Sequence, residues 1–238
     1  MKLFCFPHAG GYSYYYNFIK QSEYKNIDEV FIYEYYGRNA KKDTIKPASF
    51  SQLVQLASEY VYSNLNDGEE LALFGHSMGA FLAYEVSVYM VSAYNISTSQ
   101  VFLSGQRPPC TVEDGYYSSD PDIAIPFLKN LGGMKEIWNA NEATRNFFLT
   151  ILLGDLAILE TYTPTLLPKE KRLKNCVLLY GDNDYELRNR DMDLWNNHFE
   201  NIDGKYVFKG EHFYINDYHE KIINIINKST WRCKQNDF

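Results

Sequence analysis

Residues 73–79 read Leu-Phe-Gly-His-Ser-Met-Gly, a Gly-x-Ser-x-Gly sequence that lies between an apolar run and a helix-like segment. A serine in this context lies on a sharp turn from strand to helix, where its hydroxyl stands above a sheet and next to a helix N-terminus. Gly75 and Gly79 lack side chains, so the strand and the helix can approach each other closely around the strained turn. A buried structural serine is the alternative, but the flanking elements favour Ser77 as a nucleophile in an α/β fold.

The rest of the sequence supplies the strands and helices of such a fold. Helical spacing of apolar residues predicts helices over 49–65, 80–93 and 215–226. Short apolar runs predict buried strands at 2–6, 30–33, 71–74, 101–103, 177–180 and 206–208. This alternation of strands and helices predicts a mostly parallel sheet with helices on both faces.

Composition and charge indicate one soluble globular domain. The chain has 238 residues, of which 45% are hydrophobic and 22% charged, and no linker-like stretch divides residues 1–238 into two domains. The formal net charge of −7 argues against nucleic acid as the main partner.

The N-terminus and the cysteines indicate where the protein works. The apolar run at residues 3–6 is too short for a signal peptide or a membrane span, so we expect a cytoplasmic protein without a membrane partner. Cys5, Cys110, Cys176 and Cys233 lack the spacing of metal ligands. We therefore expect reduced, mostly buried thiols and no metal site.

One connection is longer than a crossover between strands requires. About seventy residues separate the strands at 101–103 and 177–180, and they include a strongly apolar helical stretch at 147–159. Insertions of this kind lie over the carboxyl ends of the strands, where ligands bind. Residues 112–160 are therefore predicted to form a helical lid; a plain crossover helix with a loop is the alternative.

A serine hydroxyl needs a base to become a nucleophile at neutral pH, and His212 is the best placed of the five histidines. His212 follows the last predicted strand, in a loop that can reach Ser77. The other four histidines are not expected to act as the base, because they point elsewhere, occupy a polar segment or fall inside the last helix: His8, His76, His198 and His219.

The acid that orients the base should follow the strand at 177–180, because the order along such chains is Ser, acid, His. Two carboxylates compete there, in the sequence Gly-Asp-Asn-Asp at residues 181–184. Asp182 follows the turn glycine and is better placed to brace the loop. Asp184 lies further out, towards the histidine loop, and is the favoured acid, with Asp182 in reserve.

The oxyanion of an acyl-transfer intermediate needs two backbone amides. The first should be that of Met78, directly after the nucleophile. The second should come from the loop after the first strand, Pro-His-Ala-Gly-Gly at residues 7–11. Ala9 is the first choice for this second donor, and His8 is the alternative.

These motifs and several others together resemble the type II thioesterases, the stand-alone α/β-hydrolases that accompany non-ribosomal peptide and polyketide synthases in antibiotic biosynthesis. The resemblance extends over almost the whole chain, whereas the serine turn alone would not separate this family from lipases. It rests on residues 6–11, 36–38, 74–80, 102–105, 108–109, 128–133, 153–155, 181–184 and 210–214.

The resemblance implies the α/β-hydrolase fold and a catalytic triad of Ser77, Asp184 and His212. It also implies a function, the removal of aberrant or stalled acyl groups from the phosphopantetheine arm of acyl or peptidyl carrier proteins through an acyl-serine. The arm belongs to the substrate, so no cofactor is expected, and we expect a monomer. Two departures from the family lie outside the triad: Leu153-Gly154-Asp155 replaces a common Arg-Ala-Asp, and Tyr185 replaces a proline.

Other functions are compatible with the same residues. A carboxylesterase or lipase acting on small free esters would use the same triad, as would an enzyme that transfers acyl groups to an alcohol or amine. A catalytically silent hydrolase fold that binds a partner is disfavoured by the complete set of groups. The basic run at residues 169–174 offers a carrier docking element, although a solvated loop is the simpler interpretation.

Overall fold

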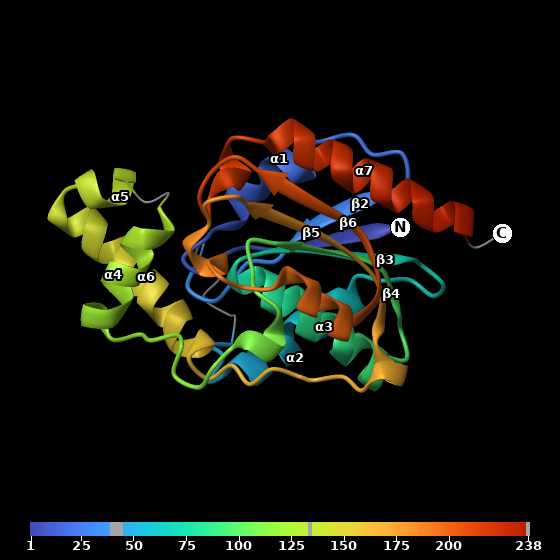
Figure 1. Cartoon of the computed structure of the whole chain (residues 1–238), viewed down its shortest axis with the longest axis horizontal. Helices are drawn as coiled ribbons and strands as arrows, with labels where there is room; N and C mark the ends of the chain where they lie inside the picture. The colour runs from blue at the N-terminus through green and yellow to red at the C-terminus, as the bar shows by residue number, and fades with distance from the viewer. Residues whose placement is uncertain (39–44, 133–134, 237–238) are drawn as a thin grey trace.

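A six-stranded parallel sheet forms the centre of the computed structural model, which describes residues 1–38, 45–132 and 135–236 (Figure 1). The strand order is β2-β1-β3-β4-β5-β6, and each neighbouring pair is parallel. The predicted parallel sheet is thus confirmed. The strands are β1 Lys2–Phe6, β2 Glu29–Ile32, β3 Leu71–His76, β4 Thr98–Ser104, β5 Leu173–Gly181 and β6 Phe199–Phe208.

Helices cover both faces of the sheet. On one side lie α2 (Phe50–Ser63) and α3 (Met78–Tyr94), and on the other lie α1 (Asn17–Lys20) and α7 (His219–Asn236) (Figure 1). Side chains alternate between the faces of a strand, and the apolar core is correspondingly split in two. In β1, Phe4 packs in the cluster with α2 and α3, whereas Leu3 packs in the cluster with α7.

The last strand and the last helix differ most from their predicted bounds. Strand β6 begins at Phe199, seven residues before the predicted start, because its exposed and partly exposed residues at the sheet edge hide the apolar signal. The predicted helix at 215–226 is wrong at both ends. Tyr214–Asn216 forms a separate 3-10 turn with Tyr214 buried against Phe208, and α7 begins only at His219.

The long connection between β4 and β5 forms three helices, α4 (Pro121–Leu131), α5 (Lys135–Asn139) and α6 (Glu142–Leu159). They lie together beyond one end of the sheet (Figure 1). Helix α6 begins at Glu142, five residues before the predicted apolar stretch. Asn141 caps it, because its side chain accepts a hydrogen bond from the amide of Thr144. These helices lie within residues 112–160, the range predicted to form a lid, of which residues 133–134 lie outside the described part.

Short 3-10 helices complete the described chain at Ser13–Tyr16, Pro109–Thr111, Lys169–Lys171, Tyr185–Leu187, Met192–Asn197 and Tyr214–Asn216. Among the helices of the described ranges, none is both long and apolar enough to cross a membrane. Cys5 and Cys176 are buried as expected, whereas Cys110 is exposed.

Candidate active site

The turn that presents Ser77 is as tight as the sequence predicts. Ser77 adopts φ 57° and ψ −124°, a strained conformation for a residue with a side chain, and its amide donates to the Ser104 carbonyl at 2.8 Å. A Cβ at Gly75 would overlap the carbonyl of Gly79, and a Cβ at Gly79 would overlap the carbonyl of Phe6. The two glycines therefore let β3, α3 and the end of β1 meet around the serine.

His212 and Asp184 form a buried pair. The Nδ1 atom of His212 lies 2.9 Å and 3.1 Å from the two carboxylate oxygens of Asp184, and both side chains are shielded from solvent. The amide of Glu186 donates to Asp184 Oδ1 at 2.9 Å, which holds the carboxylate in place. This arrangement puts the proton of a neutral imidazole on Nδ1 and leaves Nε2 as the free base.

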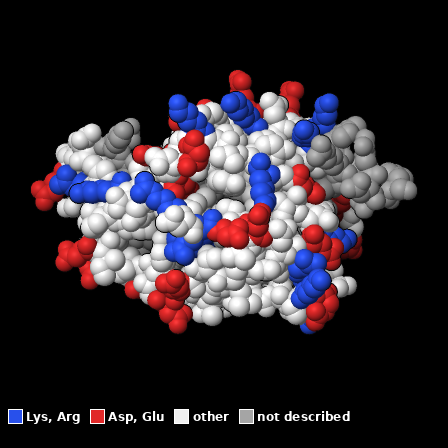
Figure 2. Space-filling view, viewed as in Figure 1, with Lys and Arg blue, Asp and Glu red and all other residues white. Residues whose placement is uncertain are grey.

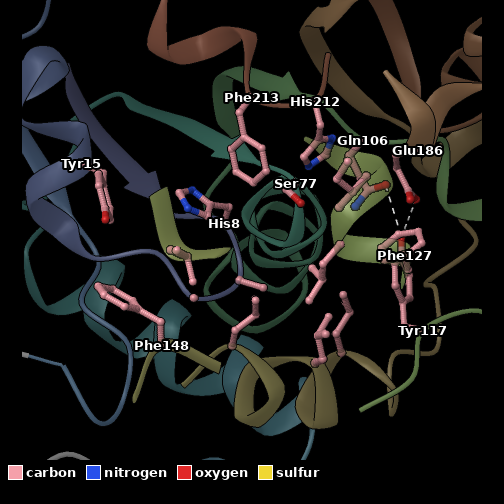
Figure 3. Close-up of a pocket in the computed structure, with 18 of the residues that line it drawn as sticks. His8, Tyr15, Ser77, Gln106, Tyr117, Phe127, Phe148, Glu186, His212 and Phe213 are labelled. Atoms are coloured by element: carbon pink, nitrogen blue, oxygen red, sulfur yellow. Dashed lines mark hydrogen bonds between the residues drawn. The ribbon is translucent and has the colours of Figure 1, made fainter. Parts of the chain in front are cut away.

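The imidazole of His212 and the hydroxyl of Ser77 line the same pocket (Figure 3). No hydrogen bond within the described residues engages His212 Nε2, although the atom is buried. Because hydrogen bonds between catalytic groups often tighten only once substrate is bound, the free Nε2 suits a base that takes the serine proton.

Asp182, the reserve acid, has another role. Its Oδ1 accepts a hydrogen bond from the Gly210 amide at 2.9 Å, and its own amide donates to the Phe208 carbonyl at 2.8 Å. A Cβ at Gly181 would lie 2.5 Å from the carbonyl oxygens of both Gly210 and Glu211. Asp182 and Gly181 therefore join the acid loop to the histidine loop, which brings Asp184 to His212.

Two other histidines lie closer to the site than the sequence indicated. The ring of His76 is 5.0 Å from that of His212, but His76 does not line the pocket of Ser77. His8 does line it, so the expectation that His8 points elsewhere is wrong. Nδ1 of His8 pairs with the Tyr16 hydroxyl at 2.9 Å, and Nδ1 of His76 pairs with the Ser104 hydroxyl at 2.8 Å. Neither ring pairs with a carboxylate in the described chain.

Electrostatics separate His212 from these neighbours. Burial, with the nearby His212, lowers the pKa of His8 to about 3 and that of His76 well below its usual value. Burial also works against protonation of His212, but the carboxylates of Asp184 and Glu186 outweigh it and raise its pKa above 6.5. Of these three rings, His212 alone has a raised pKa, which favours the imidazolium that a base forms during catalysis.

The remaining histidines are remote from this chemistry. His198 is buried, although its sequence segment is polar. Its Nδ1 pairs with the Tyr84 hydroxyl at 2.9 Å. His219 begins α7 and stacks on Phe18 with ring centroids 3.9 Å apart. Neither lines the pocket of Ser77.

The loop after β1 offers one free amide. The amide of His8 donates to the Tyr16 hydroxyl at 3.2 Å, and that of Gly10 donates to Asp155 Oδ2 at 2.7 Å. The amide of Ala9, which lines the pocket, has no acceptor among the described residues. Met78 is the first residue of α3, so its amide has no acceptor within the helix. The geometry therefore favours Ala9 over His8 as partner of Met78.

The pocket has a volume of about 350 Å³ and is apolar on the side of the insertion. Its other side is polar, with Gln106, Tyr117 and Glu186 next to His212 (Figure 3). The sequence does not mark this polar side, because its residues belong to no recognised motif. The insertion contributes Phe127, Leu128, Leu131, Ile137, Phe148, Leu152, Leu156 and Leu159.

The basic run at 169–174 lies at the amino end of β5, whereas Ser77 follows the carboxyl end of β3. Because the strands are parallel, the run and Ser77 lie at opposite ends of the strands. This favours the interpretation of the run as a solvated loop. On the face shown in Figure 2, acidic and basic side chains are interspersed. Within the described ranges, no group of three His, Cys, Asp or Glu side chains could hold a metal ion.

Comparison with known proteins agrees with this geometry. A family model described as a thioesterase domain matches residues 1–230. A probable cadicidin biosynthesis thioesterase of Streptomyces griseus is 28% identical over 217 residues, which cover 90% of this chain and 58% of that protein. The chain thus spans somewhat more than half of the length of this relative.

Solved structures resemble the whole chain. ClbQ from the colibactin NRPS/PKS pathway matches with a TM-score of 0.85 at 22% identity, over 98% of both chains. The type II thioesterase BorB from the borrelidin biosynthetic cluster matches with a TM-score of 0.77 at 27% identity, over 96% of this chain and 92% of that one. The chain belongs to the thioesterase family, as its motifs predict, and is a thioester hydrolase with the α/β-hydrolase fold.

Proposed function

We propose that Ser77, His212 and Asp184 are the catalytic triad of a type II thioesterase that releases acyl groups from the phosphopantetheine thiol of carrier proteins. The observation that supports this most directly is the buried Asp184–His212 pair, whose imidazole lines the same pocket as the strained Ser77. The carrier-protein substrate is supported by the motifs and by the similarity to BorB, itself a type II thioesterase.

The first half-reaction transfers the acyl group to the enzyme. Nε2 of His212 takes the proton of Ser77 as its oxygen attacks the thioester carbonyl. The amides of Met78 and Ala9 stabilise the oxyanion that forms. Collapse of this intermediate breaks the C–S bond, and the imidazolium returns its proton to the departing sulfur. A thiol with a pKa of about 8.5 needs little help to leave.

The second half-reaction releases the acid. His212 takes a proton from a water molecule, which attacks the acyl-serine carbonyl, and the imidazolium then protonates Ser77 as it leaves. Asp184 keeps Nδ1 protonated and stabilises the imidazolium in both halves without taking the proton itself. The apolar side of the pocket, built by α4 and α6, receives the acyl chain and excludes bulk water.

The partners follow from the substrate. An acyl or peptidyl carrier protein brings its own phosphopantetheine arm, so the enzyme requires no cofactor of its own. A monomeric enzyme in the cytoplasm, organised as one domain with a helical lid, is part of the same proposal.

The decisive test compares three acetyl donors: acetyl-phosphopantetheinyl carrier protein, acetyl-coenzyme A and a simple aryl acetate. We expect the highest kcat/KM with the carrier protein, and Ser77→Ala to lower the rate on every donor by a factor on the order of 10⁴ or more. Faster turnover of the aryl ester than of either thioester would instead identify a carboxylesterase. Unchanged hydrolysis by Ser77→Ala would remove the triad from the mechanism.

A further inference from the structure

The polar side of the acyl pocket contains a donor whose orientation the surrounding protein fixes. Gln106 is 2% exposed, and the Trp195 indole nitrogen donates to its main-chain carbonyl at 3.4 Å. The amide of Arg107 donates to the side-chain Oε1 of Gln106 at 2.9 Å, and the Tyr117 hydroxyl approaches the same oxygen at 3.4 Å. The Tyr117 hydroxyl gives its single proton to Glu186 at 2.8 Å, but the Arg107 amide can only donate. Oε1 must therefore face the Arg107 amide, and the other amide position must hold the NH₂ group.

This NH₂ group is free. Across the described residues, no atom accepts a hydrogen bond from Gln106 Nε2. The nearby carboxylate of Glu186 is already occupied, since Oε1 accepts from Tyr117 at 2.8 Å and lies 2.7 Å from Arg107 Nε, and Oε2 accepts from Tyr116 at 3.3 Å. A fixed donor in the wall of a largely apolar pocket favours a ligand that offers an acceptor at this point.

The position of Gln106 indicates which part of the substrate it meets. The carbonyl of Ser104, two residues earlier, accepts the hydrogen bond from the Ser77 amide, so Gln106 lies close to the nucleophile. In Figure 3, Gln106 and His8 lie on opposite sides of Ser77. The proposed oxyanion amide of Ala9 adjoins His8, so Gln106 faces the acyl chain rather than the reacting carbonyl oxygen.

Beyond Gln106 the pocket becomes apolar. Leucines of α4 and α6 line the remainder, including Leu128, Leu152 and Leu156. The pocket thus combines one donor near the reacting carbon with an apolar wall, which fits an oxygen substituent near the thioester followed by hydrocarbon.

We propose that Gln106 is a specificity-determining residue, and that the pocket prefers acyl groups with a keto or hydroxyl oxygen close to the thioester carbon over saturated ones. This inference rests on the proposed thioesterase function and adds the class of acyl group to it. The NH₂ group of Gln106 donates a hydrogen bond to that oxygen, and a saturated chain leaves the donor unpaired.

The test uses three N-acetylcysteamine thioesters of equal chain length: butanoyl, 3-hydroxybutanoyl and 3-oxobutanoyl. Values of kcat/KM are measured for the wild type, Gln106→Met, which removes the amide, and Gln106→Glu, which keeps an oxygen for Arg107. For each substrate, the kcat/KM of the variant is divided by the kcat/KM of the wild type. This ratio cancels the different intrinsic reactivities of the three thioesters.

We expect both variants to lose roughly three- to tenfold more kcat/KM on the two oxygenated substrates than on the butanoyl thioester, the value of one neutral hydrogen bond. Gln55→Met makes the same chemical change on the exposed face of α2. Its ratio of kcat/KM to that of the wild type should be the same for all three thioesters. Thermal unfolding of each variant verifies that it is folded.

The outcomes separate the two proposals. Equal losses on all three substrates in both folded variants would overturn the specificity role and leave the thioesterase function intact. A wild-type protein that hydrolyses neither these thioesters nor acetyl-phosphopantetheinyl carrier protein would overturn the function and this inference with it.

Discussion

Arg38 and Asp155 form a buried ion pair that holds the loop after β1 from both sides. The Nη1 of Arg38 lies 3.2 Å from Asp155 Oδ1, and its Nη2 pairs with Oδ2. The Nε of Arg38 donates to the Gly11 carbonyl at 3.2 Å, while Asp155 Oδ2 accepts from the Gly10 amide at 2.7 Å. One salt bridge thus fixes the Gly10 amide, directly after Ala9, and the Gly11 carbonyl.

This ion pair also connects the insertion to the catalytic loop. Asp155 belongs to α6, and Leu152 of the same helix would lie 3.1 Å from a Cβ at Gly10. A shift of α6 would therefore move the amide of Ala9, the proposed oxyanion donor. The sequence places Arg38 and Asp155 in separate motifs, and only the fold shows that they act on the same loop.

We predict that Asp155→Ala lowers kcat more than it changes KM. The substitution frees the Gly10 amide and leaves Arg38 buried without its partner, so the oxyanion amide loses its fixed position. A displacement of about 1 Å can cost roughly 100-fold in rate, whereas the acyl pocket keeps its apolar lining. Steady-state kinetics on acetyl-carrier protein separate the two parameters.

Glu85→Ala provides the control for lost stability. Glu85 is also a buried carboxylate, but it accepts hydrogen bonds from the Tyr162 hydroxyl and the Thr165 amide, each at 2.9 Å, away from the pocket. Both variants should have lower midpoints of thermal unfolding, since each leaves buried donors unpaired. If both variants lower kcat to the same extent, the role of Asp155 is structural only.

The pH profile should report the titration of His212. The base must be neutral to take the serine proton, so kcat/KM should rise with pH through the pKa of His212. Because Asp184 and Glu186 raise this pKa above 6.5 despite burial of the ring, the half-maximal point should lie above that pH. Glu186→Gln removes one negative charge and should move the half-maximal point to lower pH.

Tyr117→Phe is the matched control for this shift. It removes the hydroxyl that donates to Glu186 at 2.8 Å but leaves the carboxylate charge in place. The half-maximal pH of kcat/KM should then stay where it is in the wild type. An identical shift in both variants would assign the effect to pocket geometry and not to the charge of Glu186.

Features that were predicted from the sequence depend on local signals. The serine turn follows from the two glycines of residues 73–79, whose missing side chains let strand and helix meet. The choice of His212 and Asp184 follows from their order in the chain, because the loops that follow parallel strands all lie at the carboxyl ends of the strands. Here the sequence places the residues, and the structure adds the distances between them.

The remaining features arise from contacts between distant segments. Gln106, Arg107 and Glu186 form one polar wall although about eighty residues separate the first two from the third. No periodicity or spacing marks such a wall, since each member follows its strand at an ordinary loop position. The orientation of His8 was missed for the same reason, because the Tyr16 hydroxyl that fixes it lies in another turn.

Two adjacent phenylalanines of α6 should differ in their effect on acyl-chain length. Phe148 lines the pocket, whereas Phe147 is 58% exposed on the outside of the helix. We predict that Phe148→Ala enlarges the pocket and raises kcat/KM for long acyl chains relative to short ones. Phe147→Ala should leave this ratio unchanged. The measurement is a series of N-acetylcysteamine thioesters from acetyl to decanoyl, and parallel profiles for the two variants would disprove the lining role.

Two glycine substitutions should change stability in opposite directions. Gly75→Ala places a methyl group against the carbonyl of Gly79 at the serine turn, where neither backbone can yield, so it should destabilise the fold by about 1–3 kcal/mol or more. Gly154 lies in the middle of α6 on its solvent-exposed side, and a methyl group added there by Gly154→Ala would have no neighbouring atom within 4 Å. It should stabilise the fold by about 0.5–1 kcal/mol, because alanine loses less conformational freedom in a helix than glycine does. Urea unfolding measures both free energies, and a destabilising Gly154→Ala would mean that α6 needs glycine for a contact other than its helical backbone.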